Sequence, residues 1–253
     1  MKRGVNKKSQ LTLYIIIALV IIAFIILFFT LRNRAKPGEI NVINAEEYID
    51  KCMRDSAEEA VEIMLPQGGY LSPSNYKLYN NTKVAYLCKM DYYYAPCINL
   101  EPMYIEHLES EIKNYSQSKV DRCFVNLESQ MGKRGYDSSF EGGGELKVEL
   151  NPNQIQVDAD KKLTLEKNGQ TTRYENFSVS FANPIYDLAI ISVEIVNYEA
   201  EDCEFHYSEY EKNYPRFNID KVFTENSTKI YTIGNEMQLR FATRSCALPG
   251  GFI

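Results

Sequence analysis

The chain has 253 residues, 28 of them basic and 34 acidic, so that its net charge is −6 at pH 7. All seven basic residues before Glu39 flank one uncharged segment, and the 21 basic residues that remain leave the rest of the chain at −13. A strongly acidic domain repels nucleic-acid phosphates and anionic lipid headgroups. We therefore do not expect nucleic acid as a partner, and we expect the charge to serve mainly solvation.

An uncharged apolar segment, Leu11–Leu31, follows Lys7 and Lys8 and is 21 residues long. As a helix rising ~1.5 Å per residue it would be ~32 Å long, enough to cross the lipid bilayer. A buried core helix is the alternative, but core helices are rarely apolar for this length. A cleaved secretory signal has a shorter apolar region and small residues after it, whereas Arg32 and Arg34 follow here. We predict a retained transmembrane helix.

The basic residues on the two sides of this helix suggest its orientation. Four precede it and three follow it, which favours a cytoplasmic N-terminus and places the rest of the chain outside the cell membrane. The predicted division is 1–10 as a short basic segment, 11–31 as the transmembrane helix, 32–43 as a linker, and 44–253 as an extracytoplasmic α+β domain, with a subdivision near 135–144 as an alternative.

Six cysteines lie beyond the apolar segment, and none belongs to a CxxC motif. An even number scattered over one domain is typical of disulfides in an oxidising compartment, although buried thiols in a cytosolic domain are the alternative. Cys52 and Cys123 have similar sequence settings on two expected helices. Among the fifteen connectivities that six cysteines allow, we favour these three pairs: Cys52–Cys123, Cys88–Cys97 and Cys203–Cys246.

Two helices are predicted in the first half of the domain. Asn44 and Glu47 form a capping-box pattern before a periodic apolar stripe, which Pro66 and two glycines end. A second helical pattern runs from Glu101 to about Gln130, with a break expected near Ser116–Ser118. The stretch between the two helices is rich in Tyr, Asn, Pro and Ser, and we expect loop with short strands there.

After Gly142 the period changes to two, which is typical of strands with one buried face. Asn168-Gly169 is a strong hairpin-turn signal, and residues 185–198 fit a helix or, because of their β-branched content, a strand. Expected strands cover 145–150, 154–157, 162–166, 176–181, 217–224, 229–233 and 237–244. The fold class is therefore α+β, with helices packed on an antiparallel β-sheet.

Signals for an enzyme are poor. His107 and Glu111 lie four residues apart on a predicted helix and could share a metal, but two ligands without a third make no site, and a solvated helix face explains them. A disulfide at Cys203 would remove the thiol nearest to His206. We find no phosphate-binding loop or hydrolase motif. No catalytic residue, metal or cofactor is predicted.

Tyrosines offer the best candidate for a contact surface. The chain has 19 Tyr and no Trp, and Tyr92, Tyr93 and Tyr94 lie between Cys88 and Cys97. Tyr combines apolar area with a polar tip, which suits contacts with other surface proteins or with glycans. The alternative is that alternate rings pack inward on a short strand.

The segment Lys7-Lys8-Ser9-Gln10-Leu11-Thr12-Leu13, followed by Ile-rich sequence, resembles the N-terminus of archaeal type IV pilin-like precursors. The resemblance implies cleavage between Ser9 and Gln10, which would leave the apolar helix on the mature chain as a filament core. Tyr14 stands at the fifth mature position, where that family often has an acidic residue.

The rest of the chain resembles uncharacterised archaeal single-pass membrane proteins, a resemblance that implies no activity. It is carried by Cys52–Ala60, Gln67–Tyr70, Ala85-Tyr86, the tyrosine run and Phe241–Cys246. Our leading hypothesis is a membrane-anchored cell-surface protein with a disulfide-stabilised domain and a structural or binding role. A pilin-like filament subunit is the alternative, and an anchored hydrolase is a third.

Overall fold

The computed structural model describes residues 45–213 and 215–248, which belong to one compact unit of class α+β. The predicted anchor Leu11–Leu31 and the cleavage candidates Ser9 and Gln10 lie outside the described residues. None of the helices from residue 45 onward combines the length and the apolar composition that crossing a bilayer demands.

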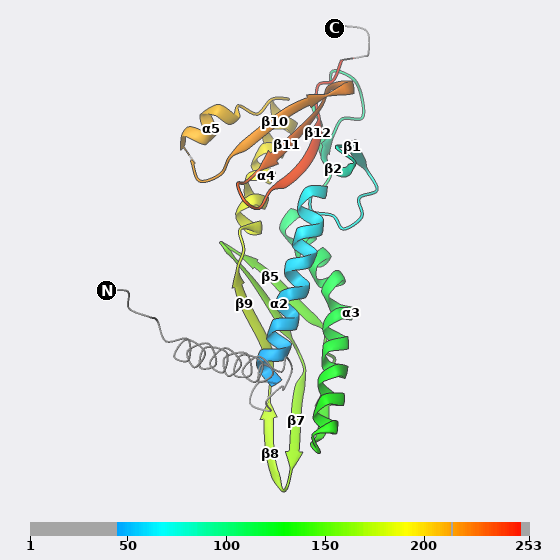
Figure 1. Ribbon diagram of the computed structural model, residues 1–253. Coiled ribbons are helices and arrows are strands. Elements are labelled where there is room, and N and C mark those ends of the chain that lie inside the picture. Colours follow the sequence, from blue (N-terminus) through cyan, green and yellow to red (C-terminus); the bar gives the residue numbers. More distant parts are fainter. Residues whose placement is uncertain (1–44, 214, 249–253) are drawn as a thin grey trace, which may run out of the picture. The chain divides into compact units, whose positions relative to one another are not determined.

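Helices and groups of short strands follow one another along the described chain (Figure 1). In chain order the elements are α2 (Ala45–Met64), the 3₁₀ helix η2 (Leu65–Gln67), β1 (Tyr76–Tyr79), β2 (Thr82–Lys89), β3 (Ile98–Asn99), α3 (Tyr104–Lys133), β4 (Asp137–Glu141), β5 (Leu146–Asn151), β6 (Gln154–Ala159), β7 (Lys162–Lys167), β8 (Gln170–Tyr174), β9 (Phe177–Ala182), α4 (Ile185–Glu201), α5 (Tyr207–Asn213), β10 (Ile219–Thr224), η3 (Glu225–Ser227), β11 (Thr228–Ile233) and β12 (Leu239–Arg244).

The strands form three sheets rather than the single antiparallel sheet that was predicted. Two sheets are antiparallel throughout, in the orders β5-β6-β9 and β4-β7-β8. The third, called here the C-terminal sheet, has the order β1-β2-β12-β11-β10, and its β12–β2 pair is parallel. The prediction missed this pairing because a parallel ladder joins strands far apart in sequence, and local alternation carries no signal for it.

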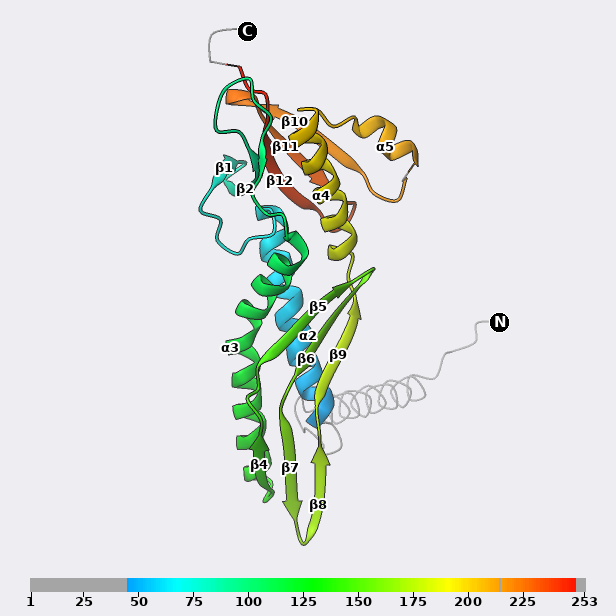
Figure 2. The ribbon, with the colours of Figure 1, turned by 180° about the vertical axis from the view of Figure 1, so that it is seen from behind.

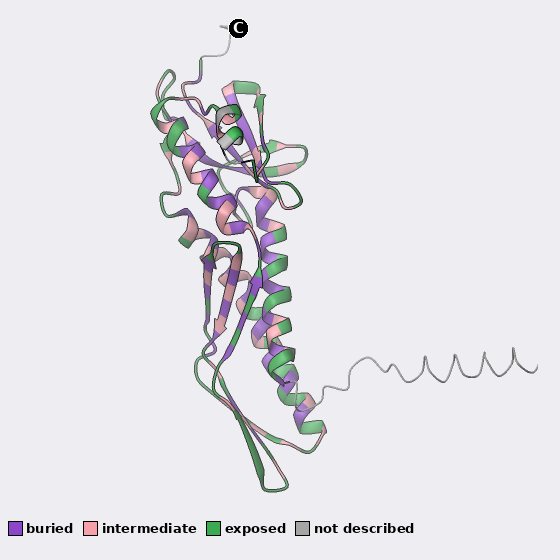
Figure 3. Cartoon of the chain, turned by 90° about the vertical axis from the view of Figure 1, so that its left-hand side faces the viewer, coloured by how far each residue is buried: buried purple, intermediate pink, exposed green. Residues whose placement is uncertain are grey.

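Helices α2 and α3 lie side by side and contact the sheet β5-β6-β9 (Figures 1 and 2). The buried residues of α2 recur every three or four positions, as an amphipathic helix requires, and Figure 3 shows buried and exposed residues alternating around the helices. Along β5, β6 and β9 buried and more exposed residues alternate with period two. One face of this sheet is therefore solvated, as predicted.

Helix α3 is continuous over 30 residues, so the predicted break near Ser116–Ser118 is wrong. Ser116 is fully buried and lies between Ile112 and Val120 on the buried side of the helix. Its small side chain keeps the buried stripe in register, and tertiary packing outweighs the modest helix propensity of serine.

Residues 185–198, for which helix and strand were both open, are helical as part of α4. The Ile185 N–H donates to Asn183 Oδ1 (3.0 Å), and Pro184 immediately precedes the first helical residue. Helix α4 packs on β11 and β12, and Figure 2 shows it in front of the C-terminal sheet. The buried Ile and Val side chains of α4 face that sheet. Their β-branched character left helix and strand equally open, and packing against the sheet favours the helix.

Asn168-Gly169 forms a hairpin turn as predicted, with φ of 53° and 77°. The strand after the turn is β8, however, and it precedes the predicted strand at 176–181. Four of the five β8 residues are exposed, so β8 lacks the alternation that marks a half-buried strand. Strand β4 was missed as well.

Candidate functional site

Three disulfides join the cysteine pairs that the sequence favoured. Their Cα–Cα distances are 6.6 Å for Cys52–Cys123, 5.4 Å for Cys88–Cys97 and 5.7 Å for Cys203–Cys246. The first pair links the adjacent helices α2 and α3, and the second closes the loop after β2. All three separations lie within the range that a disulfide needs.

The three tyrosines of that loop are exposed. Tyr92, Tyr93 and Tyr94 have exposed fractions of 78%, 50% and 62%, and none of them belongs to a strand. Inward packing on a strand, which the sequence left open, is therefore excluded. We call residues 89–97 the tyrosine loop.

The tyrosine loop is fixed to the chain segment that follows β12. The Tyr94 N–H donates to Ala247 O (3.1 Å), and the Cys246 N–H donates back to Ala95 O (2.9 Å). The Cys97 N–H donates to Ser245 Oγ (3.0 Å). The Cys88–Cys97 disulfide closes the loop at its base. Because its backbone is held at several points, the loop presents its rings with little conformational entropy left to lose on binding.

The candidate metal pair His107 and Glu111 holds a turn instead. His107 Nε2 lies 3.0 Å from Gly69 O, and Glu111 Oε2 accepts a hydrogen bond from the Leu71 N–H (2.7 Å). Gly69 has φ of 83°, and a Cβ there would lie 2.6 Å from Leu108 Cδ2, so only glycine fits. In the described part of the chain, no group of three or more His, Cys, Asp or Glu side chains is placed to hold a metal.

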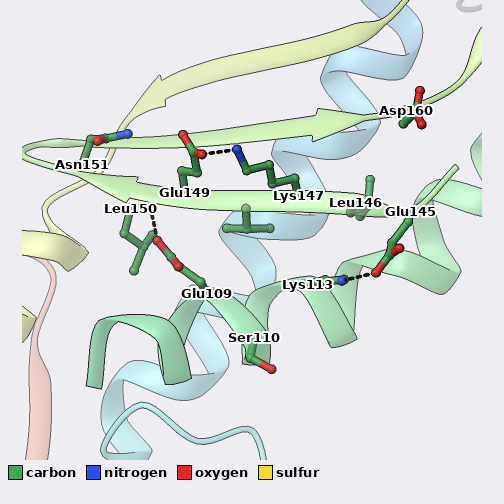
Figure 4. A pocket seen from close by; sticks show the side chains of 11 residues that line it. Glu109, Ser110, Lys113, Glu145, Leu146, Lys147, Glu149, Leu150, Asn151 and Asp160 are labelled. Atoms are coloured by element: carbon green, nitrogen blue, oxygen red, sulfur yellow. Dashed lines mark hydrogen bonds and ion pairs between the residues drawn. The ribbon is translucent and has the colours of Figure 1, made fainter. Parts of the chain in front are cut away.

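A groove of about 840 Å³ lies between α3 and the edge strand β5 (Figure 4). Gln117 on α3 accepts a hydrogen bond from the Leu146 N–H and donates to Gly144 O, both at 2.9 Å. Glu109 accepts from the Leu150 N–H at 2.8 Å. Glu109 and Gln117 are eight residues apart on the helix, a rise of ~12 Å, and Leu146 and Leu150 are four residues apart on the strand, a rise of ~13 Å. The two side chains of α3 are therefore spaced like the two backbone amides that they bind at the edge of β5. The helix thereby blocks addition of another strand at these positions.

The charges in this groove are largely paired with one another. Lys113 forms an ion pair with Glu145 (2.5 Å), and Lys147 forms one with Glu149. Burial raises the pKa of the Glu109 carboxyl, although its hydrogen bond from Leu150 acts in the opposite direction. Four carboxylates line the groove against these two lysines, and we see in it a solvated acidic surface rather than a nucleophile set beside a base.

A buried ion network connects α4 with the inner face of the C-terminal sheet. Lys229 Nζ donates to both carboxylate oxygens of the fully buried Glu199, at 2.9 and 2.8 Å. Tyr231 OH donates to Glu199 Oε1 at 2.5 Å. Burial and the Glu199 charge raise the pKa of the Tyr231 hydroxyl well above its usual range. These groups are closed off from substrate, so the network is structural.

The network extends to Glu204, which pairs with Lys221 and, at 3.2 Å, with Lys229. Burial opposes ionisation of Glu204, but the hydrogen bonds from the two lysines outweigh it and lower its pKa. Ser245 Oγ donates to the Glu199 carbonyl (2.6 Å) while it accepts from Cys97. The buried network is thereby joined through Ser245 to the base of the tyrosine loop.

Comparison of this chain with family models, with curated proteins and with solved structures finds no match. Its function is therefore inferred from its own residues. Among the sites described, the tyrosine loop combines exposed aromatic side chains with a fixed backbone.

Proposed function

We propose that this chain is a membrane-anchored cell-surface protein whose disulfide-stabilised outer domain binds a partner through the tyrosine loop. The observation that carries the proposal is the exposure of Tyr92, Tyr93 and Tyr94 on a backbone fixed by a disulfide and by hydrogen bonds. Tyrosine supplies large, amphipathic contact area with only two rotatable side-chain bonds. Three consecutive exposed aromatic rings form the kind of exposed patch that often marks an interaction site.

The membrane anchor in this proposal is Leu11–Leu31, and its support is the length and composition of that segment. Three disulfides in the domain support an oxidising compartment on the outer side. Protease added to intact cells should remove the domain and leave a membrane-bound N-terminal fragment. Full protection of the domain in intact cells, with digestion only after lysis, would contradict the proposed orientation.

The binding role is tested with the full chain in nanodiscs of zwitterionic lipid and immobilised envelope fragments of the source organism. Replacing Tyr92, Tyr93 and Tyr94 together by Ser should lower binding at least about tenfold, since each exposed aromatic anchor contributes about 1 kcal/mol or more. The matched control replaces Val125 and Ile190, exposed apolar residues on α3 and α4, by Ser. Equal binding by the tyrosine variant and the unchanged chain would refute the role of the loop.

A further inference from the structure

The C-terminal sheet has one face that α4 does not cover, called here the outer face. In parallel and antiparallel ladders alike, directly paired residues share a face, so the register assigns its members from Ile230↔Ala242 and Ala242↔Tyr86 outward. The register of β12 and β2 shifts between Ala242 and Thr243, and the pair Arg244↔Lys89 follows that shift. Contacts agree with this assignment, since Tyr86 OH lies 3.1 Å from Thr228 Oγ1 and Ile230 packs with Ala242. The outer face comprises Lys77, Tyr79, Thr82, Val84, Tyr86, Lys89, Asp220, Val222, Thr224, Thr228, Ile230, Thr232, Arg240, Ala242 and Arg244. Five of these, Val84, Tyr86, Thr228, Ile230 and Ala242, are buried, so a ligand would meet the side chains around them.

The charge of this face is opposite to that of the domain. It carries four cations, Lys77, Lys89, Arg240 and Arg244, against one carboxylate, Asp220. Within the described residues none of these four cations has a carboxylate within ion-pair distance. The excess of positive charge on this face contrasts with the net charge of −13 of the domain.

Three of these cations lie over tyrosine rings and are oriented by them. Lys89 Nζ is 5.1 Å from the Tyr86 ring centre, and Arg240 Cζ is 5.7 Å from that of Tyr79. Arg240 Nε donates to Thr232 Oγ1 at 3.2 Å. The ring contact and this bond hold the guanidinium in place while its terminal nitrogens remain available to a ligand.

The outer face is continuous with the tyrosine loop. Arg244 Cζ lies 5.5 Å from the centre of the Tyr93 ring, and Arg244 Nε donates to Asn226 O at 2.9 Å. Arg244 therefore connects the row of cations to the exposed rings. A ligand long enough to cover both would meet apolar rings at one end and cations at the other.

Two properties point to the chemistry of the ligand. None of the four cations has a carboxylate partner within the described residues, so the face suits a polyanion. Exposed tyrosine rings adjoin these cations, as Tyr93 adjoins Arg244, so the same surface suits flat rings. A linear polyanion with flat rings fits both properties.

We infer that the outer face and the tyrosine loop together bind an acidic polysaccharide, a linear chain of sugar rings with carboxylate or sulfate groups. This inference rests on the proposed function, because it names the class of partner for the same loop. The rings of the tyrosine loop stack on the apolar faces of sugar rings, and the cations pair with the acidic groups.

The test uses the full chain in zwitterionic nanodiscs and titrates it with polygalacturonate and with neutral dextran. Polygalacturonate should bind, dextran should not, and affinity should fall as salt rises from 50 to 500 mM, roughly as for other polyanions. Replacing both Arg240 and Arg244 by Gln should weaken binding about tenfold and reduce the salt dependence by about half, because two of four cations are lost. Restoring charge with Lys at both positions should recover part of the affinity.

The matched control replaces Arg122 and Arg173, both exposed and outside the outer face, by Gln. An equal loss in this control, or no polygalacturonate binding by the unchanged chain, overturns the inference. Tighter binding of poly-glutamate or of oligo-dT than of polygalacturonate overturns its ligand class. The envelope experiment with the serine variant of the tyrosine loop is independent, so binding to envelopes without binding to polygalacturonate would leave the proposed function standing and remove only this inference.

Discussion

Around α2 and α3, lysines lie against glutamates, as Lys113 does with Glu145 and Lys119 with Glu59. In the C-terminal sheet the charges divide by face. Lys229 and Lys221 on the inner face pair with glutamates, whereas Arg240 and Arg244 on the outer face lie against tyrosine rings and have no carboxylate partner among the described residues. The comparison shows which charged side chains of this domain have no carboxylate partner within its described part and can pair with a ligand. Lysines of the helical region are neutralised by neighbouring glutamates, whereas the four cations on the outer face of the C-terminal sheet have no carboxylate partner in the part of the chain that the structure describes.

The largest effect on stability is expected from Glu199→Ala in the buried network. The substitution removes the carboxylate that accepts from both the Lys229 ammonium and the Tyr231 hydroxyl, and among the described residues it leaves Lys229 only Glu204 and Cys203 O as acceptors. Loss of this buried partner should lower the free energy of unfolding by about 3–5 kcal/mol. Replacing Glu199 by Leu together with Lys229 by Met removes both charges and should restore most of it. Chemical denaturation of the full chain in detergent measures both variants, and a loss below about 1 kcal/mol for Glu199→Ala would show that the network is not tightly buried.

Removing disulfides should separate stability from binding. Cys52–Cys123 spans 71 residues and Cys88–Cys97 spans nine, so on the loop-entropy model their removal by paired Ala substitutions costs about 4 and about 3 kcal/mol. Binding to envelope fragments should respond in the opposite order, because only Cys88–Cys97 closes the tyrosine loop. Thermal unfolding and the nanodisc binding assay give the two readouts. Unchanged binding after loss of Cys88–Cys97 would mean that the loop does not need to be fixed.

A smaller, stabilising effect is expected at Asp50 on α2. One carboxylate oxygen of Asp50 is buried without a hydrogen-bond partner. Burial and the nearby Glu46 raise the pKa of Asp50 to about 6, although Arg54 acts in the opposite direction. A raised pKa means that the folded state binds the proton more tightly than the unfolded state. The folded state therefore loses stability as the pH rises from about 4 to about 6.

Asp50→Asn removes that charge, so it should stabilise the fold at pH 7.5 and have little effect near pH 3.5. The gain should be about 1 kcal/mol, less than the full shift implies, because the side chain is partly exposed and screened. Melting temperatures of both chains across this pH range measure the difference. An Asp50→Asn effect that is the same at both pH values would show that the carboxylate is solvated.

Local patterns in the sequence predicted much of this fold. The stripe of α2, the alternation in β5, β6 and β9, and the Asn168-Gly169 turn are short-range signals, and each matches the structure. The similar settings of Cys52 and Cys123 on two helices also indicated their pairing. What failed was non-local: the parallel β12–β2 pair and the continuity of α3 through Ser116 depend on packing partners far away in the chain.

The candidate site was predicted in part. The tyrosine run marked Tyr92–Tyr94, but their exposure depends on the segment at 245–247, which no local pattern links to them. The outer face was missed. Arg240 and Arg244 are the two residues of β12 that are not buried, and their spacing of four residues places both arginines on one face. Only the strand order shows that Tyr79, Tyr86 and Lys89 join them there.

The account depends on one claim, that partners bind at the tyrosine loop and the adjoining outer face. Hydroxyl-radical footprinting of the full chain in nanodiscs, read by mass spectrometry with and without polygalacturonate, tests this claim most directly. We predict that oxidation of Tyr92, Tyr93 and Tyr94 falls on binding while that of Val125 on α3 does not change. Protection confined to α3 and β5, with the three tyrosines oxidised as before, would contradict the account.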